Sequence, residues 1–192
     1  MEPFLFIDKQ NISKTLCDYI LSLHLYTITH LNENQIENIT NEYVSDSTLK
    51  IVNDVNIIIP LYPEESSDWF SITQYIIDKL ESAIKCFIEK HSLNVYNMDN
   101  IIQNSDFLQA NIVLYKKFDN VYHNDFLVTK KVHSTLSYIW CLNTTCTIVF
   151  GKSHTIIMEK GDLLLFPASW EYPYKLDADG IYLKGTLYTS YE

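Results

Sequence analysis

The sequence contains no arginine: all 14 of its basic residues are lysines, and glycine and alanine occur only four times each. Without a guanidinium group, no side chain can form a planar two-pronged pair with a carboxylate or phosphate, so an anion must be held by lysine, hydroxyl or backbone groups. Isoleucine (23) and asparagine (15) are abundant. This bias suggests A/T-rich codons in a low-GC genome, as in many viruses and some protists, and indicates nothing about chemistry.

Positive charge is also scarce, because 24 acidic residues leave the 192-residue chain at a net charge of −10. Such a chain is poorly suited to binding nucleic-acid phosphates, so we expect no nucleic-acid partner. Residues 1–107 hold 16 acids and 6 lysines, whereas residues 108–192 hold eight of each and all four glycines. The length suits one domain over residues 1–192, and the charge split predicts an acidic N-terminal layer (1–107) around a neutral core (108–192).

Long apolar runs and a basic N-terminal region are absent, so we expect no membrane span, no secretion signal and a cytoplasmic protein. The four cysteines form no C-x-x-C pair. In a cytoplasmic protein this spacing predicts reduced, buried thiols rather than disulfides.

Apolar spacing predicts helices over residues 12–24 and 67–91, the second with one continuous apolar stripe. Weak alternation suggests a strand at 26–31, and further strands are expected at 49–52 and 55–61. From residue 108 onward the pattern changes to short strands separated by turns. They are expected at residues 108–115, 135–142, 147–150, 154–158, 162–166, 172–176 and 181–188. We therefore expect an α+β fold, with an antiparallel sandwich or barrel and helices against one outer face.

Only one group of residues suggests chemistry. His123 and Asp125 follow a predicted strand that ends at Tyr115, and they are separated by one residue. Alternation along an extended chain places the two side chains on one side, where they could supply two of the three ligands of a two-histidine-one-carboxylate iron site. Taken alone, this spacing more often belongs to a solvated loop.

The flanking motifs resemble those of the prolyl-4-hydroxylase-like branch of the iron(II) and 2-oxoglutarate-dependent dioxygenases. The shared features are a tyrosine strand (Tyr115), His123-Asn124-Asp125, a strand that ends in Leu142-Asn143, and the run from Lys160-Gly161-Asp162 to Phe166-Pro167. The resemblance covers residues 108–190. It implies a double-stranded β-helix (jelly-roll) core with N-terminal helices on one outer face, with iron(II) and 2-oxoglutarate as cofactors. It further implies hydroxylation of a prolyl or similar side chain, in a protein or peptide substrate.

The resemblance also implies roles for individual residues, with one departure. Where the family places its distal histidine, this chain has Tyr174 in the sequence Pro173-Tyr174-Lys175. Iron ligands would then be His123, Asp125 and Tyr174, and the cosubstrate would contact Tyr115, Lys184 and Thr186. An alternative alignment on Gly180 puts Tyr182 at the anchor position and removes the lysine anchor. His133 and His154 are further candidates for the missing ligand.

Three functions remain open from the sequence. The chain could be a working dioxygenase with Lys184 and Thr186 holding the far carboxylate of 2-oxoglutarate. It could be a degenerate member of the same fold that acts as a binding or scaffold protein, as the replacement by Tyr174 suggests. A cupin-like barrel is a third interpretation, which the lack of a His-x-His pair disfavours.

Overall fold

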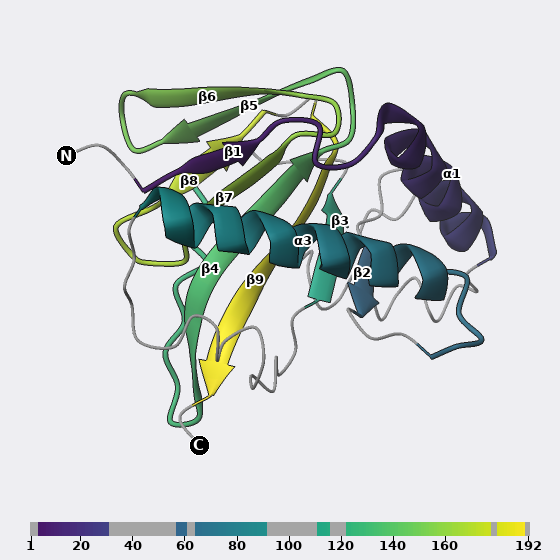
Figure 1. The fold of residues 1–192 in the computed structure, drawn as a ribbon, viewed down its shortest axis with the longest axis horizontal. Helices are drawn as coiled ribbons and strands as arrows, with labels where there is room; N and C mark the ends of the chain where they lie inside the picture. The colour runs from purple at the N-terminus through teal and green to yellow at the C-terminus, as the bar shows by residue number, and fades with distance from the viewer. Residues whose placement is uncertain are drawn as a thin grey trace.

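The computed structural model describes residues 4–30, 57–60, 64–91, 111–115, 122–177 and 180–190. Two helices and several short strands make up this part of the chain (Figure 1). Their order is β1 (Phe6–Asp8), α1 (Lys14–His30), β2 (Ile57–Pro60), α3 (Phe70–Lys90), β3 (Asn111–Tyr115), β4 (Val132–Cys141), β5 (Thr145–Phe150), β6 (His154–Glu159), β7 (Leu163–Pro167), β8 (Tyr174–Leu176) and β9 (Tyr182–Ser190).

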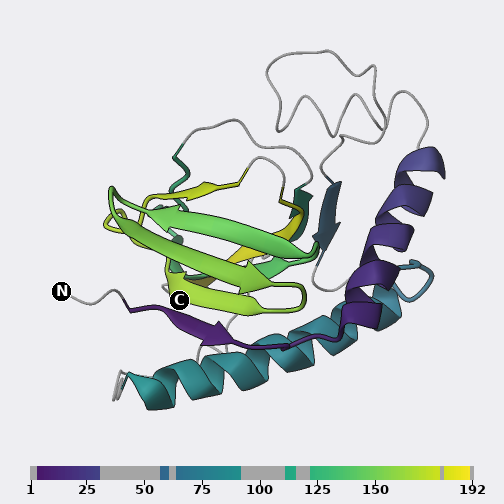
Figure 2. The ribbon, with the colours of Figure 1, turned by 90° about the horizontal axis from the view of Figure 1, so that it is seen from above.

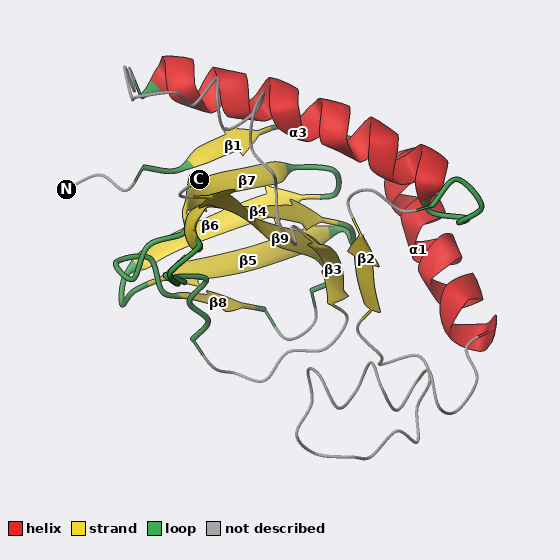
Figure 3. Cartoon of the chain, turned by 90° about the horizontal axis from the view of Figure 1, so that it is seen from below, coloured by secondary structure: helices red, strands yellow, loops and turns green. Residues whose placement is uncertain are grey.

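The strands form two antiparallel sheets. The larger has the order β1-β7-β4-β9-β3-β2 and the smaller the order β6-β5-β8. Figure 3 shows α3 along one side of the larger sheet, with β5 and β8 on the other side. The mixture of helices with antiparallel sheets confirms the expected α+β class.

Alternation along the central strands separates two apolar cores. On β4, Tyr138 and Trp140 belong to a cluster that also contains residues of α1 and α3. Ile139 and Cys141 point to the opposite face, into a second cluster between the two sheets. The inward face of β4 is therefore the one that meets the smaller sheet, where the candidate site lies.

Helix α3 confirms the helix expected over residues 67–91. Its buried residues recur every three or four positions, from Ile72 and Ile76 to Leu80 and Phe87, whereas Asp78, Lys85 and Glu89 are exposed. Figure 2 shows the helix crossing beside β1. Within the described part of the chain, no helix combines the length and the apolar composition that a membrane span needs.

One local expectation near the N-terminus was wrong, and one strand there was not expected. Residues 26–30, expected as the beginning of a strand, continue α1 to His30, because no glycine or proline interrupts the helical pattern there. Strand β1 was not expected, because three residues are too few to show alternation. Its extended conformation is stabilised by antiparallel pairing with β7. The expected strand at 49–52 lies outside the described residues, and β2 confirms the one at 55–61.

The expectation of four reduced, buried cysteines was also wrong. Cys141 and Cys146 form a disulfide that joins the end of β4 to the start of β5. The tight connection between these strands brings the two Cα atoms to 5.8 Å, within the range a disulfide requires. Of the two free thiols, Cys86 is exposed and Cys17 is buried, and burial raises the pKa of Cys17 to about 11.

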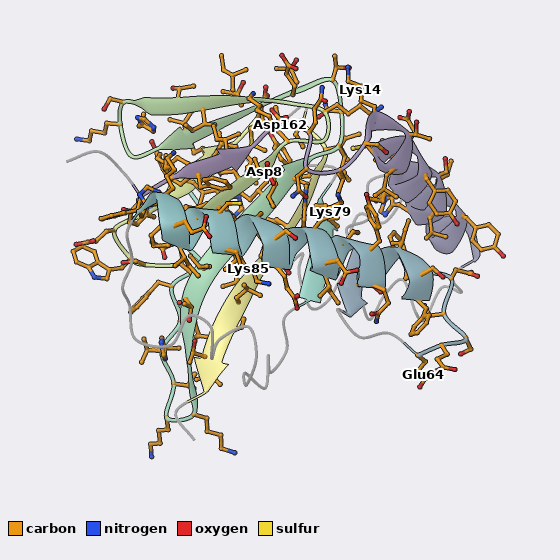
Figure 4. The ribbon with its side chains drawn as sticks, in the orientation of Figure 1. Asp8, Lys14, Glu64, Lys79, Lys85 and Asp162 are labelled. Atoms are coloured by element: carbon orange, nitrogen blue, oxygen red, sulfur yellow. A yellow bond between two sulfur atoms is a disulfide. The ribbon has the colours of Figure 1, made fainter. Side chains whose placement is uncertain are left out.

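The Gly161-Asp162 pair of the motif anchors the N-terminal segment. Asp162 is 1% exposed and accepts hydrogen bonds from Lys9 Nζ (2.8 Å) and from the backbone nitrogens of Gln10 (2.9 Å) and Glu159 (2.9 Å). In Figure 4, Asp162 lies beside the segment that joins β1 to α1. These contacts give the motif a structural role, since they hold that segment to the turn between β6 and β7.

We expect Asp162→Asn to destabilise the chain by about 2 kcal/mol at neutral pH. Burial raises the pKa of Asp162, but the hydrogen bonds from Lys9 and the two backbone amides outweigh burial and lower it below its ordinary value of 3.8. The stabilisation is therefore complete above the unfolded-state pKa and is lost as the pH falls through the lower folded-state pKa. Urea unfolding between pH 6 and pH 2 checks this: the variant should lose less stability than the wild type, and parallel curves would contradict it.

Candidate functional site

The site begins where the segment after residue 121 meets β8. His123 and Tyr174 form an isolated antiparallel bridge, with the nitrogen of His123 donating to the oxygen of Tyr174 at 2.7 Å and the reverse bond at 2.9 Å. The two rings lie side by side, with centroids 5.7 Å apart. This bridge places Asp125, two residues further on, next to the Tyr174 side chain.

Asp125 is the centre of the site because its carboxylate accepts from three elements. Oδ2 accepts from the hydroxyl of Tyr174 at 2.8 Å and from Oγ of Ser137, on β4, at 2.7 Å. Oδ1 lies 3.5 Å from the ammonium of Lys184, on β9. Lys184 also donates to the Tyr174 hydroxyl. Carboxylate, phenol and ammonium therefore form one connected cluster.

The cluster is largely withdrawn from water. Tyr174 is fully buried, and the side chains of Lys184 and Asp125 are 8% and 14% exposed. Burial lowers the pKa of the Lys184 ammonium, and the Asp125 carboxylate opposes that shift. Burial, together with the Asp125 charge, raises the pKa of Tyr188 nearby on β9. At this depth an ion pair interacts more strongly than at the surface.

Apolar side chains of both sheets pack together next to this cluster. Ile139, Ile148 and Phe166 pack there with Tyr174, and Tyr182 is fully buried beside them. The Tyr182 hydroxyl donates to the oxygen of Thr147 at 3.4 Å and accepts from the nitrogen of Asp177 at 3.1 Å. The position offered by the alternative alignment is thus a packed tyrosine with its own hydrogen bonds.

The fold brings four of the six expected site residues into contact: His123, Asp125, Tyr174 and Lys184. Thr186 pairs in register with Ser137 on the neighbouring strand, two residues from Lys184. Tyr115 pairs with Tyr182 through the backbone, and its side chain lies outside the described residues.

The alternative histidines occupy other places. His154 is exposed at the start of β6, opposite Phe150, and His133 pairs with Thr189 near the start of β4. Across the described residues, no three His, Cys, Asp or Glu side chains converge as metal ligands do. The positions of His133 and His154 therefore do not support the expectation that one of them replaces the missing distal histidine as an iron ligand.

Sequence reasoning missed Ser137, which donates to the Asp125 carboxylate. Ser137 is fully buried in a strand whose neighbours Leu136, Tyr138 and Ile139 are apolar and buried. A buried hydroxyl group at an inward position of such a strand needs a hydrogen-bond partner. The serine among apolar residues was therefore the sequence signal that could have identified Ser137 as a site residue.

Comparison with known proteins gives the fold. No family model and no curated protein sequence matches the chain. Among solved structures, the viral collagen prolyl hydroxylase vCPH of Paramecium bursaria Chlorella virus-1 matches with a TM-score of 0.55 at 12% identity, over 98% of this chain and 90% of that one. A Pseudomonas putida prolyl-4-hydroxylase matches with a TM-score of 0.54 at 11% identity, over 97% and 93%. The chain has a prolyl-hydroxylase-like fold.

A 2OG complex of the same viral enzyme also matches, with a TM-score of 0.54 at 12% identity, over 100% of this chain and 98% of that one. The likeness confirms a jelly-roll-like, dioxygenase-like fold. At this identity it concerns the fold alone.

The donors in this fold do not suit the iron site that the resemblance implies. The Tyr174 hydroxyl donates to Asp125 Oδ2 at 2.8 Å, whereas a phenol is a good metal ligand only after it has lost that proton. A divalent ion bonded to Oδ1 of Asp125 would also lie within about 6 Å of the Lys184 ammonium. At an effective dielectric constant of about 20, that repulsion is about 5 kcal/mol. The cluster fits a neutralised carboxylate better than a metal ligand set.

Proposed function

We propose that this chain is a catalytically degenerate member of the dioxygenase-like fold that acts as a binding or scaffold protein. One observation carries the proposal: the carboxylate of Asp125 is already paired with an internal ammonium, that of Lys184, and with the phenol that stands at the distal-histidine position. The apolar cluster between the sheets adds support, because Tyr182, the alternative anchor position, is fully buried in it.

The proposal treats residues 1–192 as one domain in which residues 108–192 form the double-stranded β-helix core and residues 1–107 an outer layer. The first 107 residues carry the whole net charge of −10. On the exposed face of α3, Asp78 and Glu89 are matched by Lys85 and Lys90, so the excess of acidic residues lies outside this helix. We propose this acidic layer as the interaction surface for a protein partner, with no role for nucleic acid and no membrane attachment.

A second candidate function is a working iron(II) and 2-oxoglutarate-dependent oxygenase that hydroxylates a prolyl or similar side chain of a peptide. The observation in its favour is that His123, Asp125 and Tyr174 meet at one place, as the metal ligands of such a site would. Lys184 and Thr186, on the same face of β9, would then serve the 2-oxoglutarate, with Tyr115 lining its pocket.

A turnover assay separates these two functions. The native chain is incubated with iron(II), ascorbate, 2-oxoglutarate and a proline-rich peptide, and succinate is measured by mass spectrometry. We expect the same low succinate level from the wild type, from His123→Ala and from a sample without protein. Succinate formed by the wild type and abolished in His123→Ala would establish the oxygenase and reject the degenerate form.

A further inference from the structure

The buried cation of the site comes from the chain itself. Lys184 Nζ lies 3.5 Å from Asp125 Oδ1, donates to the Tyr174 hydroxyl and sits 4.9 Å from the centroid of the Tyr174 ring. The three contacts join Lys184, on β9, to two other segments: Asp125 in the 122–128 segment and Tyr174 on β8. A flexible surface lysine would not make them together, so Lys184 is a fixed part of the cluster.

A buried carboxylate needs compensation by hydrogen bonds and an opposite charge. Ser137 and Tyr174 supply the hydrogen bonds to Asp125, and Lys184 supplies the charge. The ammonium of Lys184 and the carboxylate of Asp125 form an ion pair at 3.5 Å. The ammonium therefore balances the charge of the carboxylate.

We propose that the Lys184 ammonium holds, in this chain, the charge-balancing place beside Asp125 that a metal ion holds in a metal-dependent site. This inference rests on the proposed function and deepens it, because it names the residue that keeps the site free of metal. Tyr174 is then the hydrogen-bonding partner of an internal ion pair. Two changes are needed to make a metal site: an imidazole at position 174, and removal of the charge at position 184.

Cobalt(II) is a suitable probe because its visible absorption reports coordination by protein ligands without any turnover. The titration compares the wild type, Tyr174→His, Lys184→Met and the double variant Tyr174→His/Lys184→Met. Methionine is an unbranched, uncharged replacement that adapts to an irregular core. The matched control is Tyr174→His/Lys175→Met, which removes an equal charge from a lysine that lies over the Tyr122 ring.

We expect the double variant with Lys184→Met to bind about one cobalt(II) per chain, at least ~100-fold more tightly than Tyr174→His alone, because the fixed positive charge is gone. The control with Lys175→Met should bind like Tyr174→His. Cobalt(II) should also raise the unfolding temperature of the double variant and leave that of the wild type unchanged.

Two results would overturn the inference while leaving the proposed function intact: equal affinity of Tyr174→His and the double variant, or no binding by the folded double variant. Tight cobalt(II) binding by the wild type with loss in His123→Ala would instead reject the proposed function. If the methionine variant fails to fold, as circular dichroism would show, Tyr174→His/Lys184→Gln takes its place with the same expected and contradicting results.

Discussion

Lys184→Met is expected to lower the unfolding free energy by about 3 kcal/mol, one of the two largest effects of a single substitution that we predict. The variant leaves the Asp125 carboxylate, 14% exposed, without its nearby ammonium. The remaining donors, Ser137 and Tyr174, satisfy hydrogen bonds but do not balance the charge. Urea unfolding of both proteins, with m-values compared, measures the difference.

A double-mutant cycle shows whether this loss comes from the pair. Asp125→Asn/Lys184→Met removes both charges and keeps an oxygen that can accept from Ser137 and Tyr174. We expect the double variant to be more stable than the sum of the single losses predicts, because neutral replacement of a buried pair costs less than breaking it. Additive losses, or a Lys184→Met variant within about 0.5 kcal/mol of the wild type, would show that the two charges are not coupled.

The second large effect is expected at Gly161, where alanine should cost about 3 kcal/mol. Gly161 has φ +93°, a backbone conformation that side chains rarely adopt, and an added Cβ would lie 2.3 Å from the oxygen of Ile12. That oxygen belongs to the backbone of the segment leading into α1, and the nitrogen of Ile12 donates to the Gly161 oxygen at 3.2 Å. Neither partner can move away without breaking this contact.

Gly151 provides the matched control. It also has positive φ, +55°, but an added Cβ would meet nothing within 4 Å. We expect Gly151→Ala to cost only about 1 kcal/mol, the conformational penalty alone. The difference between the two alanine variants in urea unfolding measures the close approach at Gly161 together with its less favourable φ. Equal losses would show that the backbone conformation accounts for both.

Much of the fold could be predicted from local pattern. The apolar stripe of α3 and the short alternating strands from residue 108 onward depend on neighbouring residues, and those elements were confirmed. Strand β1 and the disulfide between Cys141 and Cys146 could not be predicted in the same way. A three-residue strand has too little pattern, and a disulfide depends on how closely the connection brings β4 and β5 together.

The candidate site, like the fold, has features that the sequence could predict and features that it could not. Spacing selected His123 and Asp125, the family resemblance added Tyr174 and Lys184, and these four residues do meet. Spacing could not give the partner of Lys184, because Lys184 and Asp125 are 59 residues apart and meet only through the pairing of strands. The resemblance assigned that lysine to a cosubstrate; in the structure its ammonium contacts the carboxylate and the phenol. The role of the residue is therefore set by three-dimensional packing.

Manganese(II) binding to the native chain tests the internal ion pair most directly. Manganese(II) is added anaerobically to the wild type in the presence of 2-oxoglutarate, and its electron paramagnetic resonance spectrum is recorded against protein-free buffer. We expect the six-line signal of the hydrated ion to keep its full intensity, because Lys184 already balances Asp125. Loss of that signal at one ion per chain, reversed in His123→Ala, would contradict the assignment of Lys184 as the cation of the site.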